Sequence, residues 1–297
     1  MQTSENLGRT ARTGRAPRPR TRPAGQASTQ GVIANVIDVA TKDCTALSDS
    51  ELAEMADMCA SGASGFEVGL LSKEREEWVL VTHVRADGQL VGFAFSSLER
   101  IGGTPSLLVG VASFARRDDS LDALRAVMGD LYRRALLAFP DEDVLVGTRL
   151  ADPAAFRAYS GLADVVPRPG HKASGEERAW GRRLAKRFGA DGQLDDRAFV
   201  VRGDGGPCGL LDYASPPAAL DDPGIDGAVG DGAVGDGAVV DGAVVDGAGI
   251  DGAVGDGSGG GAGLGELFAR LDGERRDALV AFGWAMAEDL ASSSLPL

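Results

Sequence analysis

Runs of hydrophobic residues in the middle of the chain predict a set of neighbouring β-strands. The runs 78–85 (WVLVTHVR) and 89–97 (QLVGFAFSS) flank the turn sequence Ala-Asp-Gly, a combination typical of a β-hairpin. The next run, 106–115 (SLLVGVASFA), has almost no polar positions, which predicts a strand buried on both faces. A further strand is predicted at 143–149. Together these runs indicate a sheet at the centre of one domain.

Apolar residues at helical spacing predict helices between and around these strands. Two Ser-x-x-Glu capping boxes, Ser48 with Glu51 and Ser174 with Glu177, mark helix starts because each side chain can bond the other residue's backbone amide. The predicted elements that complete the pattern are a helix with Leu52, Met55 and Met58 inward, helices at 120–138 and 153–160, a short strand near Val165 and Val166, a helix with Trp180, Leu184 and Phe188 inward, a hairpin of 198–202 with 208–213, and a largely helical segment at 263–291.

Two segments of low complexity lie outside this pattern. Residues 1–30 hold six arginines and one glutamate among small residues and have nothing to bury, so we predict a disordered arm. The arm is either a contact for nucleic acid or another polyanion, or a solvated tail. From Asp226 to Asp256 an aspartate recurs every fifth residue, each followed by glycine. A period of five fits neither helix nor strand, so a flexible acidic linker is favoured over a weak calcium site.

These shifts in composition divide the chain into five parts. Residues 1–44 are predicted to be a disordered basic arm, and 45–170 an α/β domain. Residues 171–215 are assigned to a C-terminal extension of that domain. Residues 216–262 form the acidic repeat linker, and 263–297 a C-terminal helical segment.

Charge and cysteine content exclude several classes of protein. The net charge is −14, and because residues 1–30 carry about +5, the rest carries about −19 (−14 minus 5), which argues against nucleic-acid binding except through the arm. Three scattered cysteines and two histidines offer no disulfide framework and no spacing for a metal site. The chain lacks an apolar run long enough for a membrane helix and the apolar stretch of a secretory signal, so we expect a cytoplasmic protein.

The order helix, hairpin, long strand, helix, strand, helix, strand over residues 48–168 resembles the GNAT family of N-acyltransferases. The segment 152–162, D-P-A-A-F-R-A-Y-S-G-L, is similar to the family's N-P-x-A-x-x-x-Y-x-x-x-G segment, with Asp152 in place of Asn. Asp152 is also a good N-cap and Pro153 suits the first helical position, so a helix is expected here on physical grounds alone. The resemblance implies an α/β fold with a GNAT-like mixed central sheet flanked by helices.

The resemblance also implies a cofactor and a set of site residues. The cofactor is acetyl-CoA or another acyl-CoA, and Tyr159 would protonate its departing thiolate; the alternative is a Tyr159 packed against the sheet with its hydroxyl at the rim. The strand 106–115 would splay from its neighbour and leave backbone groups free for the pantetheine arm. The residues implied to hold the cofactor are Val111, Ala112 and Ser113 along that strand, and Arg116, Arg117 and Ser120 near the pyrophosphate at the start of the following helix.

The loop before that helix departs from the family pattern. The family has glycines here that let backbone amides approach phosphate, whereas this chain has Asp118 and Asp119, whose carboxylates would repel a pyrophosphate. For the general base we name His83 and Glu99, although a lone strand histidine is often a core residue and Glu99 next to Arg100 can be a solvated strand end. Two functions therefore remain open: an acyl-CoA-dependent N-acyltransferase acting on an amine of a small molecule or a protein, and a catalytically inactive binding or regulatory domain.

Overall fold

The computed structural model describes residues 37–60, 66–115, 117, 120–205, 210–213 and 260–292, all within one compact unit, Asn35–Leu297. Its centre is a ten-stranded mixed sheet with the order β1-β2-β3-β4-β9-β5-β10-β8-β7, in which β6 also pairs with β10. The strands are β1 (Ile37–Asp43), β2 (Leu80–Ala86), β3 (Gln89–Ile101), β4 (Thr104–Phe114), β5 (Val144–Leu150), β6 (Ala163–Val166), β7 (Leu194–Asp195), β8 (Val200–Val201), β9 (Leu210–Tyr213) and β10 (Ala278–Ala285). The helices are η1 (Cys44–Ala46), α1 (Asp49–Ala60), α2 (Val68–Glu77), α3 (Ser120–Ala138), η2 (Pro153–Tyr159), α4 (Gly175–Arg187), α5 (Gly260–Phe268) and α6 (Ala287–Ser292).

Strands β1 to β4 form an antiparallel part of the sheet. Strand β2 pairs with β3 and β3 with β4, and β1 pairs with the outer edge of β2. The tight turn between β2 and β3 places Asp87 at φ 50° and Gly88 at φ 82°, the left-handed backbone that a two-residue hairpin turn requires. The predicted hairpin is therefore confirmed. Strand β4 is also confirmed as a strand buried along nearly its whole length.

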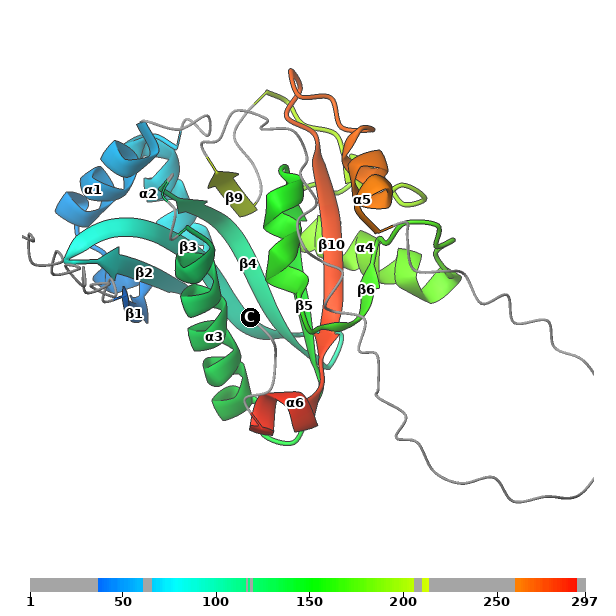
Figure 1. Ribbon diagram of the computed structural model, residues 1–297, viewed down its shortest axis with the longest axis horizontal. Coiled ribbons are helices and arrows are strands. Elements are labelled where there is room, and N and C mark those ends of the chain that lie inside the picture. The colour runs from blue at the N-terminus through cyan, green and yellow to red at the C-terminus, as the bar shows by residue number, and fades with distance from the viewer. Residues whose placement is uncertain are drawn as a thin grey trace, which may run out of the picture. The chain divides into compact units, whose positions relative to one another are not determined.

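The long helix α3 connects β4 to β5, and these two strands run parallel. They pair directly from Ser106 with Leu145 to Val109 with Thr148. Beyond that stretch the short strand β9 lies between them, parallel to both, as Figure 1 shows. The predicted fold class, a GNAT-like mixed sheet flanked by helices, is confirmed by this order of elements.

Strand β10 brings the end of the chain back into the middle of the sheet. It pairs antiparallel with β5 from Leu279 opposite Leu150 to Ala285 opposite Val144, and on its other edge it meets β6 and β8. The prediction that residues 263–291 are largely helical is therefore wrong for the central part of the segment. A continuous apolar run such as 278–285 has the same appearance in a buried helix and in a buried strand, so periodicity does not separate them.

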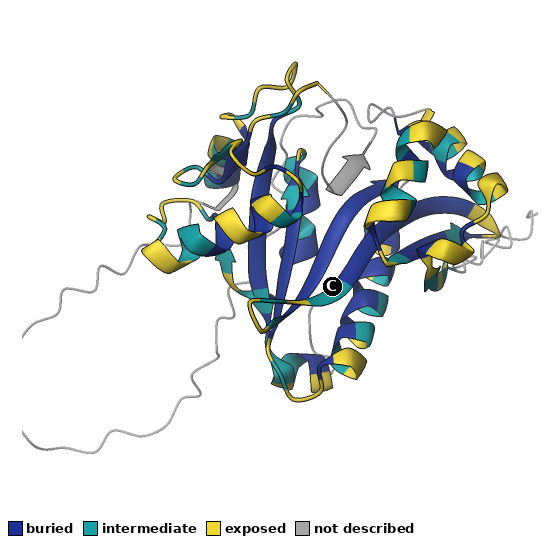
Figure 2. Cartoon of the chain, turned by 180° about the vertical axis from the view of Figure 1, so that it is seen from behind, coloured by how far each residue is buried: buried dark blue, intermediate teal, exposed yellow. Residues whose placement is uncertain are grey.

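Helices cover both faces of the sheet. Figures 1 and 2, which view the molecule from opposite sides, show α3 over one face and α1, α2 and α4 over the other. The dark interior in Figure 2 is the shared core, which includes Phe93, Phe95, Phe114, Leu131 and Phe282. Within the described part of the chain, none of the helices combines the length and apolar character needed to cross a bilayer.

Several local predictions are confirmed and others need correction. Both capping boxes form: the Ser48 amide donates to Glu51 at 2.9 Å, and the Ser174 amide donates to Glu177 at 2.6 Å. In α1 the inward residue of the last turn is Cys59, whereas Met58 is half-buried. The helix after Asp152 is a 3₁₀-helix, η2, which Asp152 caps by accepting from the Ala154 amide. Helix α2 was not predicted.

Two predicted boundaries and one predicted pairing are also wrong. The arm 1–44 was predicted to be disordered, but its last residues form β1, an edge strand that pairs antiparallel with β2 and is half-buried at alternate positions over most of its length. The linker 216–262 ends earlier, because α5 begins at Gly260. The segments 198–202 and 208–213 do not pair with each other: β8 pairs with β7 and β10, and β9 pairs with β4 and β5. The repeat itself and residues 1–36 lie outside the described residues.

Candidate functional site

The strand end that was expected to receive a cofactor is paired on both edges. Strand β3 occupies one edge of β4, and on the other edge β9 aligns Leu210 with Ala112 and Tyr213 with Phe114. The same Leu210 aligns with Leu150 at the end of β5, so β9 spans the gap between the two parallel strands. The backbone groups that the family resemblance left free for a pantetheine arm are thus engaged by the chain itself. The cofactor-binding role of Val111, Ala112 and Ser113 stays a prediction.

The turn from β4 into α3 is held by the hydroxyl of Ser120. Its Oγ lies 2.6 Å from the carbonyl oxygens of Ala115 and Arg117 and accepts the Arg117 amide at 2.9 Å. Ser120 therefore links the end of the strand to the first turn of the helix. Arg117 is exposed on this turn, whereas Arg116, Asp118 and Asp119 lie outside the described residues. The expected contact of Arg116, Arg117 and Ser120 with a pyrophosphate stays a prediction.

Tyr159 is buried at the end of η2 and its hydroxyl is hydrogen-bonded inside the protein. Its Oη donates to the carbonyl oxygen of Ala281 in β10 at 2.8 Å, and its ring packs against Phe156 with the ring centroids 5.6 Å apart. Burial raises the pKa of Tyr159 well above its ordinary value, and the neighbouring Tyr132 adds to the shift. A proton on this oxygen is therefore strongly held. This arrangement is closest to the alternative of a tyrosine packed against the sheet. Its hydroxyl, however, is not at the rim of the sheet but bonds a carbonyl of β10.

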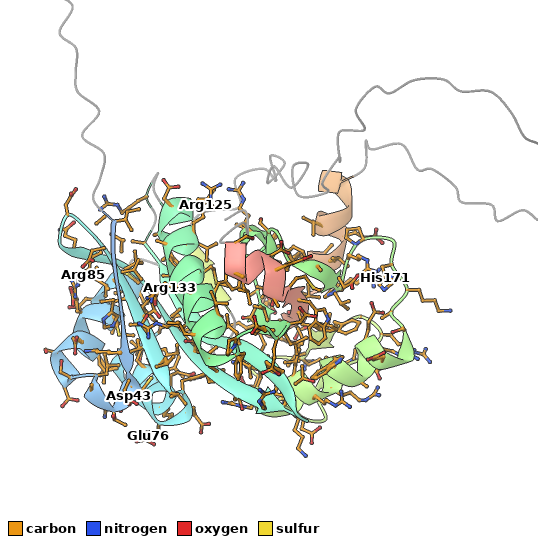
Figure 3. The ribbon with its side chains drawn as sticks, turned by 90° about the horizontal axis from the view of Figure 1, so that it is seen from below. Asp43, Glu76, Arg85, Arg125, Arg133 and His171 are labelled. Atoms are coloured by element: carbon orange, nitrogen blue, oxygen red, sulfur yellow. The ribbon has the colours of Figure 1, made fainter. Side chains whose placement is uncertain are left out.

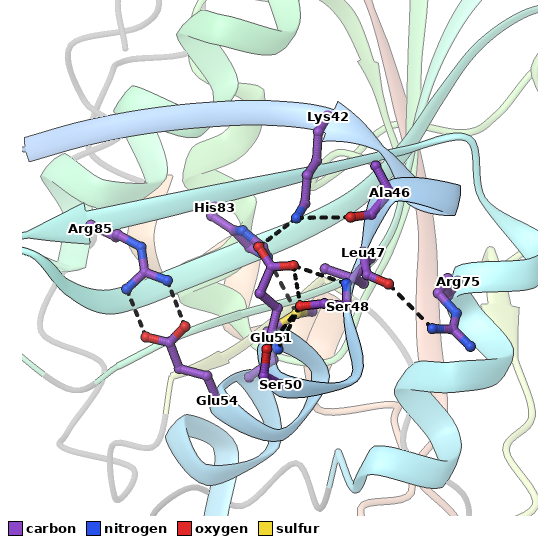
Figure 4. Close-up of polar contacts among 11 residues, drawn as sticks. Lys42, Ala46, Leu47, Ser48, Ser50, Glu51, Glu54, Arg75, His83 and Arg85 are labelled. Carbon is purple, nitrogen blue, oxygen red and sulfur yellow. Dashed lines mark hydrogen bonds and ion pairs between the residues drawn. The ribbon is translucent and has the colours of Figure 1, made fainter.

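His83 is buried on β2 beneath α1. Its Nε2 lies 3.4 Å from the sulfur of Met55, and Figure 4 shows the ring beside the polar contacts of α1. Burial lowers the pKa of His83, with the positive charges of Lys42 and Arg85 acting in the same direction. In the sheet order β2 and β10 lie on opposite sides of the β4–β5 pair, so His83 and Tyr159 do not share a site. His83 is a core histidine in this structure.

Glu99 near the end of β3 joins α4 to the sheet. Its Oε1 accepts from Arg187 Nε at 2.9 Å and from Ser97 Oγ at 2.7 Å. The Arg187 guanidinium also lies over the ring of Trp78, 4.9 Å from the centroid. Both predicted base candidates thus have local structural roles, and their catalytic roles stay predictions.

A cluster that the sequence reasoning missed lies against the middle of β4. The indole of Trp78 covers Gly110, so close that a side chain at position 110 would collide with the ring. Trp78 Nε1 donates to Glu74 Oε2 at 2.8 Å, and burial raises the pKa of Glu74 despite this bond. The Nε atom of Arg149, from β5, is buried without a hydrogen-bond partner among the described residues, and its guanidinium lies over Phe188. A glycine inside an otherwise bulky buried strand was the one available signal of this close approach.

The comparisons with known proteins give only low similarity. No protein-family model and no curated protein matches the chain. Among solved structures, a ribosomal-protein-alanine N-acetyltransferase from Brucella melitensis biovar Abortus 2308 is 21% identical over 34% of this chain and 74% of its own, with a TM-score of 0.26. The ribosomal-protein-S18-alanine N-acetyltransferase from Escherichia coli is 12% identical over 47% and 86% (TM-score 0.30), and a GNAT-family acetyltransferase from Streptococcus pneumoniae is 11% identical over 47% and 92% (TM-score 0.29).

At such TM-scores these similarities carry no weight by themselves, so the description of the domain as GNAT-like rests on its own order of elements and strand pairing. In the described arrangement β9 occupies the edge of β4, and the Ser120 hydroxyl is hydrogen-bonded within the turn. The unit thus combines a GNAT-like fold with a filled gap between its parallel strands.

Proposed function

We propose that this protein is a GNAT-like domain that works by binding or regulation and does not transfer acyl groups. The observation that carries the proposal is the position of β9, which pairs with the ends of both β4 and β5. An extended ligand would need the same backbone groups, and a strand of the same chain is present at a much higher effective concentration than a free ligand.

The predicted catalytic groups support this proposal through their environments. The Tyr159 hydroxyl is tied to Ala281, His83 lies against Met55, and Glu99 is ion-paired with Arg187. A general acid or base has to reach a reacting atom within hydrogen-bond distance. Each of these three groups instead stabilises a contact between elements of the fold.

The test is a thiol-release assay combined with thermal unfolding of the full chain. With millimolar acetyl-CoA and a panel of small amines and amine-bearing peptides, we expect no release of free CoA above the rate without protein and no rise in melting temperature. Tyr159→Phe serves as the control, because it keeps the ring but removes the bond to Ala281, at a cost of about 1 kcal/mol. Thiol release by the natural chain that exceeds release by this variant would contradict the proposal.

The second candidate is an acyl-CoA-dependent N-acyltransferase of the cytoplasm acting on an amine. It is favoured by the limited contact between β4 and β5, which pair directly over four positions before an extended segment comes between them. This function requires β9 to leave the gap. A variant lacking residues 210–213 separates the two candidates: acetyl-CoA-dependent thiol release that appears only in this variant supports the acyltransferase, and its absence supports the binding domain.

A further inference from the structure

A small pocket away from the β4–β9–β5 region gathers positive charge. It has a volume of about 220 Å³ and lies between the loop that follows β6, the turn before β8, and α5. Arg168 comes from the first of these, Arg197 from the second, and Arg270 from the turn that directly follows α5. Figure 3 labels His171, which belongs to the first loop and also lines the pocket. Three separate segments thus each contribute an arginine to one hollow.

The charges around the pocket are only partly balanced. Arg270 has Glu266 of α5 as its partner at 3.5 Å, and Glu266 is the one carboxylate among the lining residues. Arg168 donates to the Val165 carbonyl at 2.9 Å and lies 3.9 Å from Glu177, a carboxylate that also bonds His171 at 2.9 Å. Arg197 has no side-chain partner among the residues that the structure describes. With three arginines facing one lining carboxylate, the pocket is a cationic site in a chain whose net charge is −14.

The floor of the pocket is apolar. Val166 and Phe199 are fully buried there, and Leu267 of α5 is half-buried beside them. A guanidinium suits a carboxylate or phosphate because its N–H groups match two oxygens at once. The volume is below the range of about 300 to 1,000 Å³ that is usual for drug-sized ligands. The occupant that fits is therefore small, with an anionic head and a short apolar body.

We propose that this pocket binds a small organic anion through Arg168, Arg197 and Arg270. The proposal is independent of the function assigned to the β4–β9–β5 region. The same chemistry has a second source within the chain, because the acidic repeat, with an aspartate every five residues, leads directly into α5, one wall of the pocket. The experiment therefore includes one arm for a free anion and one for the repeat.

The test is isothermal titration of the full chain with phenyl phosphate, inorganic phosphate and benzyl alcohol. We expect saturable binding of phenyl phosphate, weaker binding of inorganic phosphate because it does not reach the apolar floor, and no binding of the neutral alcohol. Arg197→Gln and Arg270→Gln should each weaken phenyl phosphate about tenfold, the usual worth of a hydrogen bond to a charged group. Arg125→Gln is the matched control, since Arg125 is an exposed helical arginine with its own intrahelical partner, Asp122, and lies in a separate part of the molecule (Figure 3).

The second arm uses synthetic peptides with three Asp-Gly-Ala-Val-Gly repeats and a counterpart with Asn in place of Asp. Displacement of phenyl phosphate by the aspartate peptide alone identifies the repeat as a natural occupant, whereas displacement by neither peptide leaves a free anion as the ligand. The proposal is overturned if neither phenyl phosphate nor the aspartate peptide binds saturably at millimolar concentration. It is also overturned if Arg125→Gln weakens binding as much as the two pocket variants do.

Discussion

The two halves of the sheet are assembled in different ways. In the N-terminal half, residues 37–138, strands β2, β3 and β4 are joined by tight turns, and each pairs with its neighbour in sequence. In the C-terminal half, residues 144–285, β5 pairs along its whole length with β10, which lies beyond the whole acidic repeat. The first half depends on local contacts, whereas the second depends on the return of a distant segment. The difference determines which mutations should destroy the fold and which parts of the site the sequence can foresee.

The largest effect is expected from ending the chain after residue 259, which removes β10 with α5 and α6. Strand β10 forms seven residue pairs with β5, and nearly all of its residues are buried. The truncation exposes the middle of the sheet. The resulting loss in the free energy of unfolding should exceed the typical total stability of a domain, about 5 to 15 kcal/mol. We expect no cooperative thermal transition by circular dichroism.

A deletion of residues 231–240 within the repeat is the control for that truncation. It removes two repeat units but no described residue, and loop length changes closure entropy only weakly, so the change should be under about 1 kcal/mol. A truncated chain that still unfolds cooperatively would mean that the N-terminal half is independent of β10.

The next largest loss of stability is expected from Phe282→Ala in β10 and from Phe93→Ala in β3, one variant in each half. Both rings are buried in aromatic pairs, Phe282 with Phe199 and Phe93 with Phe95. Each substitution should cost about 3 to 5 kcal/mol in the free energy of unfolding, measured with urea. If the halves fold as one unit, both variants keep a single transition. Two transitions in Phe282→Ala alone would show that the halves unfold separately.

In the N-terminal half the sequence predicted β2, β3, β4 and α3, whose signals are local, but it missed β1 and α2. The Asp87–Gly88 turn sets the β2–β3 pairing, and the spacing of Leu124, Met128 and Leu131 identifies α3. In the C-terminal half the decisive pairings join residues far apart in the chain, and no local pattern encodes them. The apolar run 278–285 is hydrophobic enough to indicate burial, but it has no periodicity that would distinguish a strand from a helix.

The same contrast explains the outcome at the candidate site. The N-cap at Asp152 was foreseen from Asp152 and Pro153 alone, and the structure contains it. The partner of Tyr159 was not foreseen, because Ala281 is 122 positions away in the sequence. The insertion of β9 between β4 and β5 is another long-range pairing of this kind. A catalytic role that is inferred from a sequence motif can therefore be assigned to a residue only when the strands that pack around it, distant in the sequence, are known.

A smaller loss of stability is expected at two glycines covered by large side chains, Gly110 in β4 and Gly147 in β5. A methyl group at position 110 would collide with Trp78, whose ring is fixed by Glu74, whereas at position 147 it would lie 2.8 Å from a terminal methyl of Leu184. An aliphatic side chain adjusts more easily than a wedged indole. Gly110→Ala should cost about 3 kcal/mol and Gly147→Ala about 1 kcal/mol in urea unfolding. Equal losses would mean that the Trp78 cluster is no more rigid than the α4 contact.

The smallest effect concerns the two capping boxes, one in each half. A hydrogen bond from Lys42, 2.5 Å away, and bonds from Ser48 lower the pKa of Glu51 from 4.5 to about 2. For Glu177, burial alone would raise the pKa, but bonds from Ser174 and His171 outweigh it and lower the pKa. A carboxyl with a lowered pKa stabilises the fold above its ordinary pKa, and this contribution is lost as the pH falls through the folded value.

At pH 7 we therefore expect Glu51→Gln and Glu177→Gln each to lose about 1 kcal/mol or less, since both carboxylates are partly exposed. The difference in the free energy of unfolding between Glu51→Gln and the natural chain should shrink as the pH is lowered from 4.5 towards 2. The reason is that the natural glutamate then also becomes neutral. Glu76→Gln, an exposed position on α2 labelled in Figure 3, should change nothing at either pH. A loss that persists unchanged at pH 2 would show that Glu51 acts through packing and not through its charge, and the two capping boxes would then differ in kind.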